Sequence, residues 1–171
     1  MIRIRPEEYE DFDLINAINI SAFQGHDEAF LVKRLREEDA LTLSLVAEID
    51  GELAGHIAFS PMTVEFNMMN KAYIGLAPLA VKPALQKQKV GSRLVRAGLE
   101  QCLSRGWHGV FVLGEPEYYT RFGFRTAADL GFYCEYETPP ENFMAVALRP
   151  GGLEGAGGLA SYHPVFKELE K

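Results

Sequence analysis

The sequence predicts one α/β (α+β) domain, with a central, mixed and mostly antiparallel sheet of about six to seven strands flanked by helices. Apolar and polar residues alternate on both sides of Asp50-Gly51, a pair that strongly indicates a β-hairpin. Further along, an apolar run over 72–81, an amphipathic stretch over 92–105 and an apolar run over 110–113 indicate strand, helix and strand. The chain has 171 residues, 47% of them hydrophobic, which is enough for one core.

Short patterns predict the elements before the hairpin. Residues 2–5 alternate between apolar and charged side chains and predict a first strand. Pro6 and the glutamates after it predict the start of a helix, because carboxylates stabilise the positive end of the helix dipole. A second helix is expected over residues 27–38. The buried stripe of the first helix is expected to hold Leu14, Ile15, Ile18 and Phe23.

The hairpin is predicted to pair residues 43–49 with residues 53–60, and the second strand is expected to continue to Phe66. Because side chains alternate across a strand, Ile57 is expected on one face of the sheet and His56 on the other.

The apolar run over 72–81 combines two features that conflict. It is apolar on both faces, which is typical of a central strand, but Pro78 cannot donate a hydrogen bond to a neighbouring strand. Both the apolar faces and Pro78 are accounted for if the strand separates from one neighbouring strand between Gly75 and Pro78. The sheet is therefore expected to be splayed in its middle, with backbone groups free for another partner.

The later elements follow from the same rules. The helix over 92–105 is expected to bury Leu94, Val95, Leu99, Cys102 and Leu103 and to end at Gly106. After it we expect a short helix over 117–122 closed by Gly123, strands over 132–137 and 143–148, and a glycine-rich loop over 151–158.

Charge is distributed unevenly along the chain. The net charge is -7, yet no Asp or Glu lies between Glu65 and Glu100. The basic residues in that interval are Lys71, Lys82, Lys87, Lys89, Arg93 and Arg96. An acidic chain lacks the many phosphate contacts that nucleic-acid binding needs, so no nucleic-acid partner is expected. A basic loop that leads into a helix predicts instead a small phosphorylated ligand, because the first amides of a helix lack internal partners.

Cysteine content and hydropathy indicate a reduced, cytoplasmic protein. The two cysteines, Cys102 and Cys134, are too few for a disulfide scaffold and lack metal-ligand spacing, so no metal is predicted. The start of the chain has no apolar signal core. The longest apolar run, about ten residues, is far shorter than the roughly 20 that a membrane helix needs, and no membrane partner is expected.

Two motifs resemble the GNAT superfamily of acyl-CoA N-acetyltransferases. Leu79-Ala80-Val81, followed by Gln86-x-x-Lys89-x-Gly91-Ser92, is similar to that family's Gln/Arg-x-x-Gly-x-Gly/Ala cofactor loop. Tyr119-Thr120-Arg121-Phe122-Gly123-Phe124 is similar to its Tyr-x-x-x-Gly-Phe signature. The resemblance in element order covers residues 2–148, and the motifs lie on the two sides of a predicted βαβ crossover, which makes it fairly specific.

The resemblance implies a GNAT-like fold, with residues 1–171 as a single N-acetyltransferase domain and an acyl-CoA-binding core over 72–124. Acetyl-CoA would be the acyl donor, and the acceptor would be a primary amine that attacks directly in a ternary complex. A homodimer is compatible with this interpretation; the sequence does not define the acceptor, the acyl-chain preference or the oligomeric state. The residues implied to bind acetyl-CoA are Leu79, Ala80, Val81, Gln86, Lys87, Gln88, Lys89, Val90, Gly91 and Ser92.

The cofactor loop departs from the family pattern at two lysines. Lys89 stands where the family has its first glycine, and Lys87 stands where a glycine is also common. Glycine at such places serves close approach or a positive φ. Because a left-handed Lys89 would cost roughly 1–2 kcal/mol, we expect it to be helical, with its amide still able to donate to a phosphate.

The resemblance gives Tyr119 the position of the general acid that protonates the leaving coenzyme A thiolate. Glu115 and His56 are the candidates for the general base. Each also has a structural explanation: Tyr119 as a core aromatic, Glu115 as a helix-start carboxylate and His56 as a buried, hydrogen-bonded histidine.

Two other functions are kept as alternatives. A non-catalytic acyl-CoA sensor, or a degenerate family member, would account for Lys89 and for the lack of an evident base. A nucleotide-phosphate enzyme of another fold is disfavoured, because the chain lacks Gly-x-x-x-x-Gly-Lys-Ser/Thr and Gly-x-Gly-x-x-Gly. The acidic residues 1–65 suit a cationic acceptor.

Overall fold

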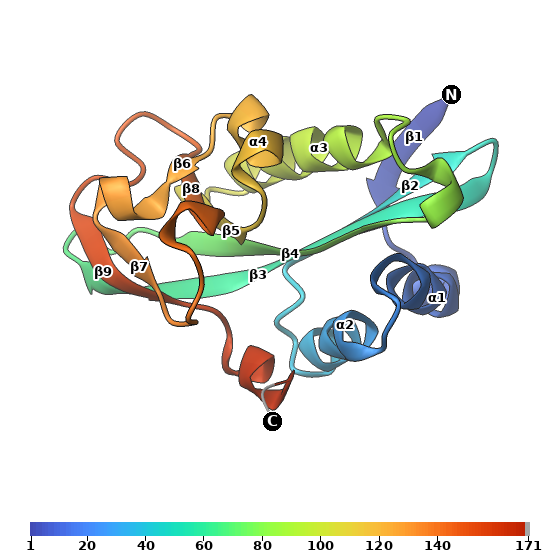
Figure 1. Cartoon of the computed structure of the whole chain (residues 1–171), viewed down its shortest axis with the longest axis horizontal. Coiled ribbons are helices and arrows are strands. Elements are labelled where there is room, and N and C mark those ends of the chain that lie inside the picture. The colour runs from blue at the N-terminus through green and yellow to red at the C-terminus, as the bar shows by residue number, and fades with distance from the viewer. Residues whose placement is uncertain (170–171) are drawn as a thin grey trace. The chain divides into compact units, whose positions relative to one another are not determined.

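The computed structural model describes residues 1–169 (Figure 1). Its strands are β1 (Ile2–Pro6), β2 (Leu43–Ile49), β3 (Glu52–Asn67), β4 (Tyr73–Val81), β5 (Gly109–Leu113), β6 (Arg125–Thr126), β7 (Phe132–Cys134), β8 (Phe143–Ala147) and β9 (Ala156–Ser161). Its α-helices are α1 (Phe12–Phe23), α2 (Asp27–Glu37), α3 (Val90–Ser104) and α4 (Pro116–Tyr119). Short 3-10 turns are η1 (Tyr9–Asp11), η2 (Pro83–Leu85), η3 (Thr120–Phe122), η4 (Ala127–Leu130), η5 (Pro140–Asn142) and η6 (Pro164–Leu169).

These residues form two compact units. The first comprises residues 1–60, 77–98 and 164–169, and the second comprises residues 61–76 and 99–163. The chain passes from one unit to the other within β3, within β4, within α3 and between His163 and Pro164. Within the described residues, no helix is long and apolar enough to cross a membrane.

The strands follow the order β1-β2-β3-β4-β5-β8-β6, with β9 beside β3 and β7 beside β9. β4 and β5 run parallel, as do β7 and β9, whereas the other described registers are antiparallel. The mixed, mostly antiparallel sheet flanked by helices is therefore confirmed. The described chain has 9 strands rather than six to seven, because β6 and β9 were not predicted.

In the first unit, helices cover both faces of the sheet (Figure 1). On one face, a Cβ at Gly98 of α3 would lie 2.5 Å from the ring of Phe59, so the small residue lets helix and strand approach closely. On the other face, α1 and α2 pack against β2 and β3, and His56 points toward α1. The predicted alternation of Ile57 and His56 is thus confirmed, since Ile57 lies beside Gly98.

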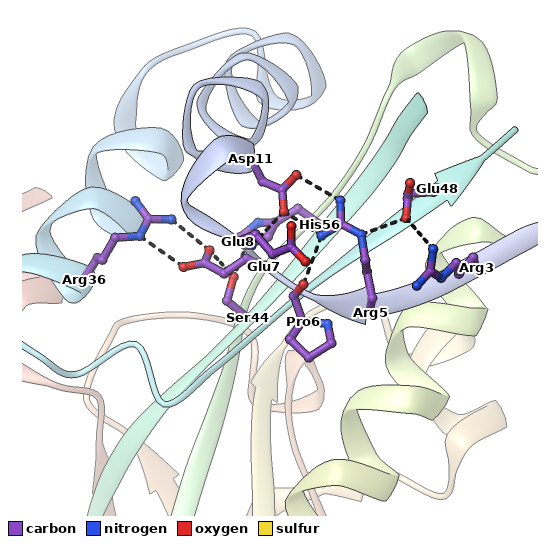
Figure 2. Close-up of polar contacts among 10 residues, drawn as sticks. All are labelled: Arg3, Arg5, Pro6, Glu7, Glu8, Asp11, Arg36, Ser44, Glu48 and His56. Atoms are coloured by element: carbon purple, nitrogen blue, oxygen red, sulfur yellow. Dashed lines mark hydrogen bonds and ion pairs between the residues drawn. The ribbon is translucent and has the colours of Figure 1, made fainter. Parts of the chain in front are cut away.

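The first helix does not begin where the sequence predicts. Pro6 ends β1, and α1 begins at Phe12 after η1. Asp11 accounts for the later start of the helix. One of its carboxylate oxygens accepts a hydrogen bond from the amide of Glu8 at 2.7 Å. Both oxygens accept hydrogen bonds from Arg5 of β1, at 2.6 and 3.0 Å (Figure 2). The Arg5 guanidinium holds the pKa of Asp11 below its usual value. This ion pair ties the start of the helix to the first strand.

The buried stripes of the helices are narrower than predicted. In α1, Ile15 and Ile18 are buried, whereas Leu14 is 50% exposed and Phe23 is 40% exposed. In α3, Leu103 is 42% exposed. Leu14 directly precedes Ile15 and so points about 100° away from it around the helix axis. Phe23 and Leu103 lie in the last turns of their helices, where less of the chain covers them.

A cluster of aromatic rings forms the core of the second unit. The ring of Phe111 in β5 lies 5.8 Å from Tyr73, 5.0 Å from Phe132 and 5.5 Å from Phe143, between ring centroids. The hydroxyl of Tyr73 donates to the carbonyl of Gly152 at 2.9 Å, which satisfies its one buried polar group. These rings connect β4, β5, β7 and β8.

β9 corrects the prediction of a glycine-rich loop. Residues 151–158 were expected to lack regular structure, but Gly157 and Gly158 lie inside β9. Glycine weakens a strand, and here β9 is paired with β3 on one side and with β7 on the other. The ring of Phe66 lies 2.8 Å from the place of a Cβ on Gly158, so a larger residue would clash. The preceding predicted strand, 132–137, is shorter than expected and ends at Cys134.

His56 is completely buried in the first unit and belongs to a hydrogen-bonded chain. The amide nitrogen of Asn19 lies 3.0 Å from the carbonyl of Ile15 and 3.2 Å from His56 Nδ1, so it donates to both. His56 Nδ1 is therefore an acceptor, and Nε2 carries the proton toward Ser44 Oγ at 2.8 Å. Ser44 in turn donates to Glu7 at 2.6 Å (Figure 2).

Arg36 of α2 closes this chain by binding the same glutamate at 2.9 and 3.2 Å (Figure 2). This series of hydrogen bonds joins α1, β3, β2 and α2. Burial, with a smaller contribution from Arg36, lowers the pKa of His56 to about 3, so the ring is neutral at neutral pH. The structural explanation of His56 is supported, since its nitrogens are both engaged and enclosed.

The free energy of unfolding should depend on pH through His56. The unfolded ring titrates near 6.5 and the folded ring near 3, so only the unfolded state gains a proton between these values. Stability should fall by about 1.4 kcal/mol per pH unit as pH drops below 6.5. His56→Gln, which keeps a donor and an acceptor but cannot titrate, should lack this slope in urea titrations between pH 4.5 and pH 6.5. Parallel slopes for the two proteins would contradict the assignment.

Candidate active site

The pairing of β4 changes along its length. Its parallel register with β5 contains four residue pairs and ends at Leu76 opposite Val112. β4 itself continues to Val81, and the next residue, Lys82, donates its amide to Ala54 of β3 at 2.9 Å. The part of β4 after Leu76 thus keeps β3 as a neighbour and has no pair in the described β5 register. This is where the sequence predicted the sheet to part.

Side-chain burial changes at the same point. The residues from Tyr73 to Leu76 are all buried, whereas Ala77, Leu79 and Val81 are half-buried and alternate with buried residues. Ala80 packs in the core beneath α1, so it can serve a ligand only through its backbone. Of the predicted binding residues on β4, Leu79 and Val81 therefore present their side chains and Ala80 does not.

A side-chain hydrogen bond holds the loop after β4 against the end of that strand. Gln86 Nε2 donates to the carbonyl of Val81 at 3.2 Å, across the turn formed by η2. One polar group of Gln86 is therefore used to hold the loop. Lys87, Gln88 and Lys89 follow as exposed residues, and Val90, which begins α3, is buried.

The conformation expected for Lys89 is wrong. Its φ is 70°, and the φ of Lys87 is 68°, so both are left-handed rather than helical. These are the positions at which the family resemblance placed glycine, and the backbone keeps the glycine-like shape although the side chains are lysines. The loop accepts a strain of roughly 1–2 kcal/mol at each residue. Strain of this kind persists where the surrounding structure enforces it, and it occurs often at ligand sites.

The start of α3 is held against the sheet by Gly55 of β3. A Cβ on Gly55 would lie 3.0 Å from the side chain of Val90 and 3.1 Å from that of Leu94, so the helix sits directly over the glycine. The first amides of α3, including those of Gly91 and Ser92, lack acceptors within the helix. Lys87, Lys89 and Arg93 lie close to these amides in sequence and are exposed, and Arg93 donates to the carbonyl of Ile2 in β1.

Tyr119 lies in the second unit, on the short helix α4. Its ring occupies the place that a side chain on Gly114 would take, which fixes the ring against the end of β5. Its centroid is 5.0 Å from Tyr118 and 5.6 Å from Phe124. Only 8% of the residue is exposed, and burial raises the pKa of its hydroxyl above the ordinary value. The Tyr119 hydroxyl is therefore protonated at neutral pH.

Glu115 occupies the N-cap of α4, where its carbonyl accepts hydrogen bonds from the amides of Tyr118 and Tyr119. Its side chain is exposed and makes no capping hydrogen bond. The structure thus brings Glu115 and Tyr119 together on one helical turn in the second unit, while the predicted cofactor residues gather in the first unit.

Tyr162, which follows β9, was not identified from the sequence. Its ring lies 2.9 Å from the place of a Cβ on Gly75, just before the point where the β5 register ends. Burial raises the pKa of its hydroxyl above the ordinary value. No local pattern could have found Tyr162, because 86 residues separate it from its neighbour Gly75 in the chain.

Neither cysteine has the properties of a nucleophile. Burial raises the pKa of the Cys102 thiol to about 12 and also raises that of Cys134. Both thiols are therefore protonated at neutral pH. Residues 1–169 contain no cluster of His, Cys, Asp and Glu side chains suited to a metal ion.

Comparison with known proteins shows the family to which the chain belongs. The sequence model of the acetyltransferase (GNAT) family matches residues 6–124. The chain is 37% identical over 167 residues to YhbS of Escherichia coli strain K12, described as an uncharacterized N-acetyltransferase; the match covers 97% of this chain and 99% of YhbS.

Two solved structures share the fold over almost the whole chain. The crystal structure of YhbS from Escherichia coli in complex with CoA has a TM-score of 0.91 at 36% identity, covering 97% of this chain and 92% of that one. A GNAT family acetyltransferase from Brucella melitensis in complex with acetyl-CoA has a TM-score of 0.79 at 35% identity, covering 97% and 98%.

The left-handed lysines lead to a prediction about stability. Lys89→Gly should raise the free energy of unfolding by about 0.5–1 kcal/mol, because glycine adopts a positive φ without strain. Lys82→Gly is the matched control, since Lys82 has a φ of -50° and glycine should destabilise it. Guanidinium titrations of the two variants should therefore move in opposite directions. Equal destabilisation by both changes would mean that Lys89 is not strained.

Proposed function

The chain belongs to the acetyltransferase (GNAT) family, and on that premise we propose that it transfers an acetyl group from acetyl-CoA to a primary amine in a ternary complex. The observation that supports this most is the end of the β4–β5 register at Leu76, just before the basic loop and α3. The CoA and acetyl-CoA complexes of two similar structures support the choice of acyl donor.

The donor would be held by the main chain and by positive charge. The pantetheine arm carries amides that can pair with the backbone of Leu79 and Val81, as an added strand would. The diphosphate suits the first amides of α3, where the helix dipole contributes about 0.3–1 kcal/mol and several amides act together. Lys87 and Lys89 would add charge at the same place. In this proposal, a backbone amide of β4 also polarises the thioester carbonyl.

The acceptor amine must be uncharged to attack. At pH 7 an alkylamine with a pKa near 10.4 loses its proton at a cost of about 4.6 kcal/mol, whereas an α-amine near 7.8 costs about 1 kcal/mol. An α-amine therefore hardly needs a base. For an alkylamine, Glu115 is the proposed base, because its exposed carboxylate begins the helix that carries Tyr119.

Tyr119 is proposed to donate to the sulfur as the C–S bond breaks. With an ordinary tyrosine pKa of about 10 and a thiol near 8.5, transfer of the proton would be uphill by about 2 kcal/mol. Burial raises the pKa of Tyr119, so full transfer before bond cleavage is less favourable than this. We therefore assign Tyr119 the role of a hydrogen-bond donor that passes its proton as negative charge develops on sulfur.

Gly91→Glu should abolish acetyl-CoA binding in calorimetric titrations, because a carboxylate at the helix start would oppose the phosphates. Gln101→Glu puts the same charge on an exposed position near the other end of α3 and should bind normally. Lys89→Gly should also retain binding. A normal titration of Gly91→Glu would remove the phosphate site from α3.

Tyr119→Phe should reduce turnover by about 10²–10⁴-fold while leaving acetyl-CoA affinity nearly unchanged, the range typical of a lost general acid. Release of thiol with saturating acetyl-CoA and a panel of amines measures the effect. Wild-type turnover in Tyr119→Phe would exclude the role. Binding of acetyl-CoA without thiol release from any amine would identify a sensor rather than an enzyme.

A further inference from the structure

A cavity of about 360 Å³ lies in the first unit, between α1 and α2. The buried part of its lining is apolar and comes from Ile15, Ala29 and Val32. Ile15 and Val32 also pack with Ala80 of β4 in one buried cluster, so the floor of the cavity is part of the core and is formed before any ligand binds. The volume is within the range of small-molecule sites in proteins.

The polar residues of the lining are divided between the two helices. Asp13 and Asn16 come from α1, and Lys33 and Arg36 come from α2. In each pair the residues are three positions apart, which makes them neighbours on one face of their helix. The cavity therefore has an acid and an amide on one wall and two bases on the other.

Three of these four side chains have no partner within residues 1–169. In that part of the chain, Asp13, Asn16 and Lys33 make no side-chain hydrogen bond or ion pair. Asp13 and Lys33 thus line the same cavity without pairing with each other. On an open surface such charges are simply hydrated, but here they flank an apolar floor. Opposite charges that stay apart in this way can bind the two ends of one ligand.

Arg36 is held in place without a ligand. Its Nε and Nη2 donate to Glu7 at 3.2 and 2.9 Å (Figure 2), and its guanidinium carbon lies 3.7 Å from the centre of the Phe12 ring, which also lines the cavity. A guanidinium fixed in this way loses little conformational freedom when a carboxylate binds its remaining N–H groups. Because Glu7 balances the charge of Arg36, Lys33 supplies the excess positive charge of this wall.

We propose that the cavity between α1 and α2 binds a free α-amino acid with an apolar side chain. The ammonium binds the carboxylate of Asp13 and the side-chain oxygen of Asn16, the carboxylate binds Lys33 and Arg36, and the side chain covers the apolar floor. An ammonium has no lone pair with which to attack an acyl group, so the amino acid is a ligand here and not the acceptor. The inference goes beyond the proposed function and does not depend on it.

Other classes of ligand fit the cavity less well. A free anion would be repelled by Asp13, and a simple amine would be repelled by Lys33. A neutral apolar molecule would displace water from Asp13, Asn16 and Lys33 without giving them partners, which costs free energy. A zwitterion satisfies both walls at once.

Leucine and two analogues test both charges of the ligand. Leucinamide keeps the ammonium but lacks the carboxylate, and 4-methylpentanoate keeps the carboxylate but lacks the ammonium. In calorimetric titrations without acetyl-CoA, leucine should bind at least about tenfold more tightly than either analogue. Glycine, which has no apolar side chain, should also bind more weakly than leucine. Equal affinities for leucine and one of the analogues, or no binding of valine, leucine and phenylalanine, would overturn the inference.

Asp13→Asn and Lys33→Gln test the location of the site. Both residues are exposed, so the fold should be retained, and each change should weaken leucine binding by about tenfold or more. Asp27→Asn and Lys167→Gln are the matched controls and should bind leucine normally. Asp27 lies in the first turn of α2 as Asp13 does in α1, Lys167 is an exposed lysine of η6, and neither lines the cavity.

The analogues separate a lost contact from a structural effect. Asp13→Asn should not weaken the binding of 4-methylpentanoate, which has no ammonium, and Lys33→Gln should not weaken that of leucinamide, which has no carboxylate. Normal leucine binding by both variants, or equal losses for leucine and both analogues in either variant, would contradict an amino-acid site at this place. Because no acetyl-CoA is present, these results are independent of whether the chain transfers acetyl groups.

Discussion

The candidate site depends on a change in hydrogen bonding within one strand. Up to Leu76, β4 is a central strand that pairs with β5 and buries its side chains on both faces. After Leu76 the β5 register stops, and half-buried residues alternate with buried ones up to Val81. Pro78 fits this point because it has no N–H to donate. A strand that keeps one neighbour and loses the other offers main-chain groups to a ligand without sacrificing its own position.

The surrounding structure compensates for this opening. Gly55 and Gly98 let α3 approach the sheet closely, so the helix start is fixed by packing. On the opposite face of the first unit, the amide nitrogen of Asn19, the two ring nitrogens of His56 and the Ser44 hydroxyl form a buried series of hydrogen bonds that ends at Glu7. These bonds join α1 to β2 and β3 and so favour one alignment of the helix on the sheet. The strained loop at residues 87–89 is therefore held at one end by the hydrogen bond from Gln86 to Val81 and at the other by the packing of α3 on Gly55.

Much of the fold was predictable from short-range patterns. The Asp50-Gly51 hairpin, the strand over 72–81 and the helix that follows were found because period-2 alternation, a turn dipeptide and a 3.6-residue stripe are local signals. β9 was missed because its glycines indicate a loop, and its pairing with β3 and β7 comes from distant parts of the chain. The start of α1 was misplaced because the ion pair of Arg5 with Asp11 outweighed the helix-start pattern at Pro6.

The sequence by itself determined the family resemblance, the order of the main elements, the basic loop before α3 and the choice of Tyr119, because each depends on residues close together in the chain. The tertiary structure decided the left-handed backbone at Lys87 and Lys89, the neutral state of His56 and the place of Tyr162 beside Gly75. These features depend on enclosure and on contacts between residues far apart in sequence, which local periodicity and propensity do not encode.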